Sequence, residues 1–231
     1  MAIVLANWKS HKTLSEAEAW MKKFFQLYSP ESGLEVIIAP SFPYLVPMWQ
    51  MLQEFGADHH ITLAAQDLSP FPFGPYTGAV AADMVSDLAG YAILGHSERR
   101  RYFHETNQEV ANKLSEAVAA GMKPIVCVDE PYARAQIAAL NDEELNDLII
   151  GYGPAEAIGG NIAQLPEKAS AAIEKIQAII PDKSILYGGS MNKDNAADYL
   201  QIGGIAGLMV GTASMDPSEF ADICRTVALA S

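Results

Sequence analysis

Polar side chains that can bind charge or move protons follow directly on short apolar runs of this chain. Asn7 ends the first apolar run and Lys9 follows it, and His96 ends the fourth. A lysine in this place would direct its charge at the mouth of a site and stabilise an oxyanion or a phosphate, although most lysines are ordinary surface residues. His96 could equally be a buried histidine of the core.

The residues after His96 favour a chemical role for it. Ser97 to Arg100 form a plausible helix start, and a helix N-terminus lowers the pKa of an imidazole. The ring would then be neutral and would donate a hydrogen bond that polarises a carbonyl group. The other histidines have no comparable neighbours; they are His11, His59, His60 and His104.

Two glycine-containing segments indicate a phosphate site. Gly188-Gly189-Ser190 and Gly211-Thr212-Ala213-Ser214 each follow an apolar run. Small residues let backbone N–H groups approach an anion closely, and a helix N-terminus adds the positive end of its dipole. A single Gly-Gly pair is more typical of a tight turn, but two matching segments favour phosphate binding.

The elements that would position these residues alternate along the chain. Eight short apolar runs recur, and nearly every one is followed by a stretch with helical spacing. Continuous apolar strands separated by helices are typical of a parallel sheet covered on both faces. The runs are Ile3–Asn7, Leu34–Ala39, Ile61–Gln66, Tyr91–His96, Pro124–Val128, Asp147–Gly151, Ser184–Tyr187 and Gly207–Val210.

The expected helices carry boundary signals of their own. Thr13 with Glu16, and Thr106 with Glu109, have the spacing of capping boxes. The fifth connection, from Tyr132 to Glu144, is the short one, with room for roughly two or three turns. The apolar stripe predicted for the first helix comprises Leu14, Ala17, Met21, Phe24 and Tyr28.

Eight βα units fit either a closed barrel or an open doubly wound sheet. An open nucleotide-binding sheet usually has a glycine-rich turn after its first strand, whereas this strand leads into Asn7-Trp8-Lys9-Ser10. We therefore expect a single-domain α/β fold over residues 1–231, a (β/α)₈ TIM barrel with a shortened fifth βα unit. Catalytic groups of a barrel lie at the carboxyl ends of its strands, where Gln66-Asp67 and Asp129-Glu130 also stand.

The composition excludes several classes of partner. A formal net charge of −13 on 231 residues argues against nucleic acid or an anionic membrane, because phosphate-rich surfaces would repel it. Cys127 and Cys224 have no metal-ligand spacing, so we expect neither a metal site nor a disulfide framework. With no basic leader and no apolar run of roughly 18 residues, we expect a soluble, cytoplasmic protein.

The motifs resemble those of the triosephosphate isomerases, in order and over essentially the whole chain. They are Asn7-Trp8-Lys9, Ala65-Gln66, Tyr76-Thr77-Gly78, Gly95-His96-Ser97-Glu98-Arg99-Arg100, Tyr187-Gly188-Gly189-Ser190 and Val210-Gly211-Thr212-Ala213-Ser214. The resemblance implies interconversion of dihydroxyacetone phosphate and D-glyceraldehyde 3-phosphate through an enediolate, in glycolysis and gluconeogenesis. It implies no cofactor and no metal.

The same resemblance implies a role for each matching residue. Asn7 and Lys9 would contact the phosphorylated triose, His96 would be the electrophile, and Glu98 would support Lys9. The phosphate would be held by the backbones of Gly159, Ser190, Gly211 and Thr212.

One position departs from the family pattern. The sixth strand of these isomerases leads to a Glu-Pro pair whose glutamate moves the proton, but here the pair is Gly153-Pro154, aligned without a gap. Positioned general acid–base catalysis contributes roughly 10²–10⁴-fold in rate, so we expect the activity to be strongly impaired. Glu156 is the nearby carboxylate along the chain, and we interpret it as a lid residue rather than as a substitute base.

The resemblance also implies self-association through the loop Phe71–Gly78, which is rich in proline and apolar residues. The family's usual Thr-Gly-Glu reads Thr77-Gly78-Ala79, so an intersubunit pairing made by that glutamate is absent. A homodimer is the first expectation. A tetramer is the second, because the short fifth unit resembles the compact archaeal type.

Three hypotheses follow for the function. The first is an isomerase altered at its base position, and the second is a non-catalytic barrel that still binds a phosphorylated ligand. The third is another phosphate-binding barrel enzyme, against which the hexapeptide Gly95–Arg100 argues.

Overall fold

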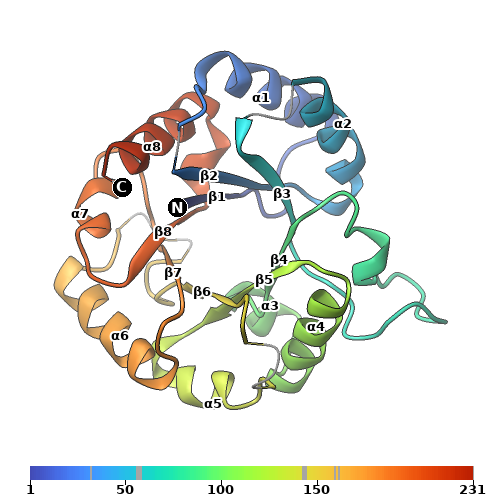
Figure 1. Ribbon diagram of the computed structural model, residues 1–231, viewed down its shortest axis with the longest axis vertical. Helices are drawn as coiled ribbons and strands as arrows, with labels where there is room; N and C mark the ends of the chain where they lie inside the picture. The colour runs from blue at the N-terminus through green and yellow to red at the C-terminus, as the bar shows by residue number, and fades with distance from the viewer. Residues whose placement is uncertain (32, 56–58, 142–144, 159, 161, 231) are drawn as a thin grey trace.

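The chain folds into a closed barrel of eight parallel strands that follow one another in sequence order (Figure 1). This computed structural model describes residues 1–231 except 32, 56–58, 142–144, 159, 161 and 231. The strands are β1 (Ala2–Asn7), β2 (Leu34–Ala39), β3 (Ile61–Ala65), β4 (Tyr91–Leu94), β5 (Lys123–Val128), β6 (Ile149–Tyr152), β7 (Ile185–Gly188) and β8 (Ile205–Val210). Since β1 pairs with β8, the barrel is confirmed and the open sheet is wrong.

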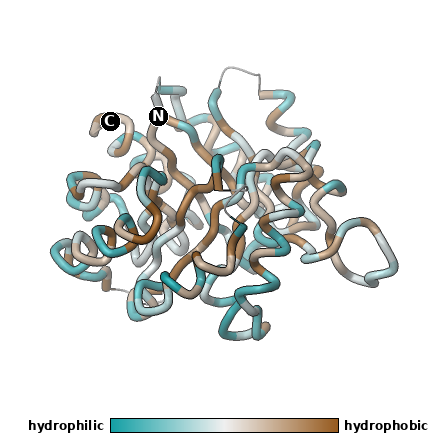
Figure 2. The backbone as a smooth tube through the Cα atoms, turned by 60° about the horizontal axis from the view of Figure 1, so that its bottom comes forward, coloured by the Kyte–Doolittle hydropathy of each residue, from teal (hydrophilic) through white to brown (hydrophobic). Residues whose placement is uncertain are grey.

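Side chains alternate along each strand between two apolar layers. Ile3 and Leu5 of β1 belong to a cluster inside the barrel, whereas Val4 and Ala6 pack in the layer between the strands and the helices. Both faces of the sheet are therefore buried, which explains why the strands have continuous apolar runs. Figure 2 shows the hydrophobic segments at the centre and hydrophilic segments on the outer helices.

The helices surround the strands as an outer ring (Figure 1). They are α1 (Leu14–Leu27), α2 (Leu45–Phe55), α3 (Ser97–Tyr102), α4 (Asn107–Ala119), α5 (Ala133–Ile137), α6 (Pro166–Ile179), α7 (Ala196–Leu200) and α8 (Pro217–Ala230). Both predicted capping boxes are present, at Thr13 and Thr106. The α5 helix has 5 residues, which confirms the shortened fifth unit.

The predicted apolar stripe of α1 is wrong at one end. Leu14 is exposed, while Trp20 is buried with Met21 and Phe24. A helical side chain covers the turn that precedes its own Cα, and no helical turn precedes Leu14, the first residue of α1.

Two strand ends differ from the prediction in ways that shape the site. The fourth strand ends at Leu94, because Gly95 adopts a positive φ of 67°, and the chain then turns so that His96 caps α3. The sixth strand continues to Tyr152, so Gly153 is the first residue after β6.

The loop Phe71–Gly78 stands away from the ring of helices, after β3 (Figure 1). Phe73 is 64% exposed, and Phe71 stacks on Tyr76 with their ring centroids 4.5 Å apart. Rigid aromatic side chains exposed in this way are typical of protein–protein contacts. Among the described residues, no helix has the length and apolarity to cross a membrane.

Candidate active site

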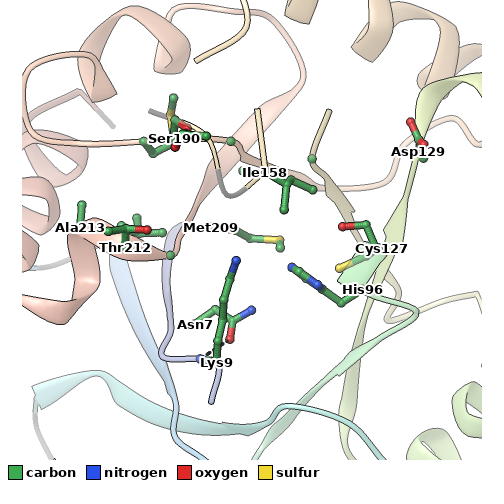
Figure 3. A pocket seen from close by; sticks show the side chains of 18 of the residues that line it. Asn7, Lys9, His96, Cys127, Asp129, Ile158, Ser190, Met209, Thr212 and Ala213 are labelled. Atoms are coloured by element: carbon green, nitrogen blue, oxygen red, sulfur yellow. Dashed lines mark hydrogen bonds between the residues drawn. The ribbon is translucent and has the colours of Figure 1, made fainter. Parts of the chain in front are cut away.

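A cavity of about 270 Å³ opens at the carboxyl ends of the strands, near the lower end of the roughly 300–1,000 Å³ common for ligand sites. A small ligand fits this size. Figure 3 shows Lys9 and His96 reaching into it from β1 and from the turn after β4. Of the predicted site residues, those that line the cavity are Asn7, Lys9, His96, Gly153, Ser190, Gly211 and Thr212.

The end of β1 holds Lys9 in a strained conformation. Its φ is 52°, and such backbone strain costs of order 1–3 kcal/mol unless surrounding contacts impose it. The amide of Lys9 donates to Asn7 Oδ1 at 3.0 Å, and its carbonyl accepts from Ser41 Oγ and Gln66 Nε2 at 3.1 and 2.9 Å. Gln66 thus positions Lys9, although it does not itself line the cavity.

Glu98 does not line the cavity but binds Lys9 directly. Lys9 Nζ lies 2.5 Å from Glu98 Oε1. This ion pair directs the ammonium group and partly balances its charge.

The imidazole of His96 has a defined tautomer. Its Nδ1 accepts a hydrogen bond from the backbone amide of Glu98 at 3.2 Å, so a neutral ring carries its proton on Nε2. Burial is the main cause that lowers the pKa of His96, Lys9 lowers it further, and Glu98 opposes them. We predicted a lowered pKa from the helix N-terminus, but the larger cause is loss of solvent, which disfavours the charged form.

A buried ion-pair network fixes α3, and with it His96 and Glu98. Asp67, after β3, accepts from Lys113 of α4 at 2.7 Å and from Arg99 of α3 at 2.8 Å. Glu105 forms ion pairs with both Arg99 and Lys113. The network ties the segment after β3 to the two consecutive helices α3 and α4, and so forms one support behind His96.

The segments after β7 and β8 border the other end of the cavity. Ser190 has a φ of 52°, and its Oγ lies 2.8 Å from the carbonyl oxygens of both Ala157 and Gly160, which share its one hydroxyl proton. A Cβ on Gly211 would lie 3.9 Å from Lys9 Nζ, so backbone amides and a lysine charge meet here. Gly159, also predicted to hold phosphate, lies outside the described residues.

The predicted helix N-termini after β7 and β8 differ in form. A short 3₁₀ helix, Thr212–Met215, begins directly after Gly211, and α8 starts only at Pro217. After β7 the next helix, α7, starts at Ala196. The N–H groups near the cavity therefore come mainly from turns rather than from long helices.

Gly153 faces the cavity, and Ile158 fills the space beside it. A Cβ on Gly153 would stand 2.9 Å from Ile158 Cδ1 and 3.1 Å from the carbonyl oxygen of Gly188. Figure 3 shows the Ile158 side chain directed into the cavity between Ser190 and Cys127. The place of the missing side chain is thus occupied by an apolar group.

The sequence predicted that Glu156 is the carboxylate near position 153, but other carboxylates line the cavity. Glu156 accepts a hydrogen bond from Gln164 Nε2 at 3.0 Å and does not line the cavity, whereas Asp129 and Glu219 do. Asp129 had a signal in the sequence, because it directly follows an apolar strand. Glu219 lies in the first turn of α8, beyond the 3₁₀ helix that follows β8, so a search of the residues that directly follow strands does not find it.

Comparison with known proteins agrees with this geometry. The family model described as triosephosphate isomerase matches residues 2–227. The chain is 36% identical to a triosephosphate isomerase of Xanthomonas euvesicatoria, over 98% of both chains. It is 36% identical to that of Thermus thermophilus, over 96% of this chain and 97% of the relative. It is 37% identical to that of Dehalococcoides mccartyi, over 98% and 96%. The chain belongs to the triosephosphate isomerase family.

Proposed function

We propose that this protein is a triosephosphate isomerase, which interconverts dihydroxyacetone phosphate and D-glyceraldehyde 3-phosphate without a cofactor. One observation carries the proposal: the neutral His96, with its proton on Nε2, and the Lys9 ammonium line the same cavity as Ser190 and Gly211. The cavity thus combines a proton donor for the carbonyl group, a positive charge and backbone amides that can bind phosphate.

The proposed roles follow from this arrangement. Backbone amides at Ser190, Gly211 and Thr212 bind the phosphate, and Lys9 neutralises its charge. Nε2 of His96 donates to the carbonyl oxygen and stabilises the enediolate as negative charge develops there. Asn7 holds the backbone of Lys9 and contacts the substrate, while Glu98 orients the Lys9 side chain.

The non-catalytic barrel is the less favoured alternative, because the family match spans the polar groups of the site as well as the fold. Two assays on the purified protein separate the alternatives: turnover of D-glyceraldehyde 3-phosphate, and binding of 2-phosphoglycolate, which mimics the enediolate. Turnover together with binding supports the isomerase. Binding without turnover supports the alternative, and the absence of both would contradict the proposed site.

We further propose a cytoplasmic homodimer, with a tetramer as the second expectation, formed through the loop Phe71–Gly78. The exposed aromatic rings of this loop support the proposal. Sedimentation equilibrium of the protein and of Phe73→Asp tests it, since a charge in the contact should shift the mass towards the monomer. An unchanged mass would exclude this loop as the interface.

A further inference from the structure

We propose that the carboxylate of Asp129, at the end of β5, abstracts and returns the proton in place of the glutamate that is absent at position 153. This inference rests on the isomerase function proposed above.

Asp129 and Gly153 are neighbours at the rim of the barrel. The last paired residues of β5 and β6 are Val128 and Tyr152, so the next residue on each strand is Asp129 and Gly153. Neighbouring strands lie roughly 4.8 Å apart. The Asp129 carboxylate therefore lies one strand away from position 153, where the other members of the family have their glutamate.

The strand geometry turns the Asp129 side chain inwards. Ile125 and Cys127 belong to the inner cluster, whereas Val126 and Val128 belong to the outer layer. The backbone of Asp129 is still extended, with φ −111° and ψ 124°, so the alternation continues and its side chain lies on the inner side. Asp129 lines the same cavity as His96, and Figure 3 places it at the rim, beyond Cys127.

The surroundings of Asp129 suit a general base. Burial raises the pKa of Asp129, as do the charges of Glu156 and Glu130, and Arg100 opposes them. A base is more effective when its pKa approaches the working pH. Among the described residues, no hydrogen bond or ion pair engages the Asp129 carboxylate, so both oxygens are available to a substrate.

The other acidic groups near the cavity are less suited to this task. Glu98 is paired with Lys9, and Glu156 is bound to Gln164 outside the cavity. Burial raises the pKa of the Cys127 thiol to about 12, so it stays protonated at neutral pH. Glu219 also lines the cavity, but it belongs to α8, which follows the phosphate segment after β8, whereas Asp129 follows the strand that pairs with β6.

The proton transfer balances with Asp129 as the only added group. Its carboxylate takes a proton from C1 of dihydroxyacetone phosphate, the C1–H electron pair forms the C1–C2 double bond, and the carbonyl electrons move to the C2 oxygen. His96 stabilises that oxygen and relays the hydroxyl proton from the C1 oxygen to it. Asp129 then returns its proton to C2, which gives the aldehyde. The reacting carbons must therefore lie between His96 and Asp129.

The variant Asp129→Asn tests this role, since it keeps the size of the side chain and removes the base. We expect kcat, and the exchange of C1 hydrogens for deuterium in D₂O, to fall by about 10²–10⁴-fold. Binding of 2-phosphoglycolate should be retained, and the acidic limb of the kcat/KM pH profile should disappear. Retained ligand binding also shows that the variant is folded.

Two matched controls change carboxylates that do not line the cavity. Glu130→Gln alters the adjacent residue, which pairs with Lys175 at 2.7 Å, and Glu156→Gln alters the carboxylate that is closest to Gly153 along the chain. Each charge only adjusts the pKa of Asp129, so both variants should lose less than about tenfold in turnover and exchange, against the roughly 10²–10⁴-fold of Asp129→Asn. If the unaltered protein turns over and Asp129→Asn does too, the role of Asp129 is wrong while the isomerase function stands. If the unaltered protein shows neither turnover nor exchange, the proposed function fails, and the role of Asp129 with it.

Discussion

Ile158 Cδ1 lies only 2.9 Å from the point where a Cβ on Gly153 would stand. Real Cβ atoms do not tolerate so short a contact, so any side chain at position 153 must displace Ile158. The absence of a base at position 153 and the inward position of the isoleucine are thus linked by packing.

The first prediction concerns this contact. Gly153→Ala should lower the free energy of unfolding by about 1 kcal/mol, the lower end of the usual cost of overpacking, as measured by urea denaturation, because Ile158 Cδ1 is the end of a flexible side chain that lines the cavity. Ile158→Val removes Cδ1 and should relieve part of that cost in the double variant, with a coupling of at least about 0.5 kcal/mol. Strictly additive effects would show that the two residues do not compete for space.

A second prediction moves the base back to β6. In the Asp129→Asn background, Gly153→Glu should raise kcat for D-glyceraldehyde 3-phosphate by about 10²–10⁴-fold, because a carboxylate again follows the sixth strand. Gly153→Gln in the same background is the matched control and should give no increase. Equal rates for the two variants would mean that position 153 does not face the reacting carbon.

A third prediction concerns the charge of His96. Because burial and Lys9 lower the pKa of His96, its NMR titration should have a midpoint below the usual value of about 6.5. Glu98 opposes the shift, so Glu98→Gln should move the midpoint lower still. As the pH falls through about 6.5, His96 becomes protonated in the unfolded chain but stays neutral in the folded protein. The free energy of unfolding therefore decreases. A midpoint above 6.5 would contradict this assignment.

The phosphate end of the site supplies a fourth prediction. Lys9→Gln should weaken the binding of 2-phosphoglycolate, measured by calorimetry, by roughly 10- to 150-fold, since a hydrogen bond to a charged group contributes about 1.5–3 kcal/mol. Lys12→Gln is the control, because the Lys12 ammonium donates to the Met215 carbonyl and does not line the cavity. Equal losses in both variants would indicate a general effect of charge.

The fifth prediction addresses the support behind His96. Lys113 and Glu105 side chains are 5% and 3% exposed, and removal of one partner from a buried pair costs about 3–5 kcal/mol. Lys113→Met should therefore reduce the free energy of unfolding by that amount in guanidinium denaturation. Lys193→Met breaks an exposed pair with Asp194 and should have an effect of at most about 1 kcal/mol.

Much of the site could be predicted from the sequence, because a parallel barrel brings the residues after its strands to one end. Asn7 is the last residue of β1, and four other residues stand within two positions of a strand end: Lys9, His96, Ser190 and Gly211. All five line the cavity. The buried support of Gln66, Asp67 and Lys113 was harder to predict in detail. Its partners come from three segments, and only their packing decides which charges meet.

The sequence by itself determined the order of the strands, the capped helices and the glycine at position 153, since these depend on local patterns and on motif spacing. Only the tertiary structure decided which side chains reach the cavity beside that glycine. Glu156 is closer in the chain, yet its loop directs it to Gln164. Asp129 is distant in sequence, yet β5 pairs with β6 and its side chain faces inwards. Closeness along the chain does not fix where a side chain points, whereas the hydrogen bonds between β5 and β6 hold Asp129 beside Gly153.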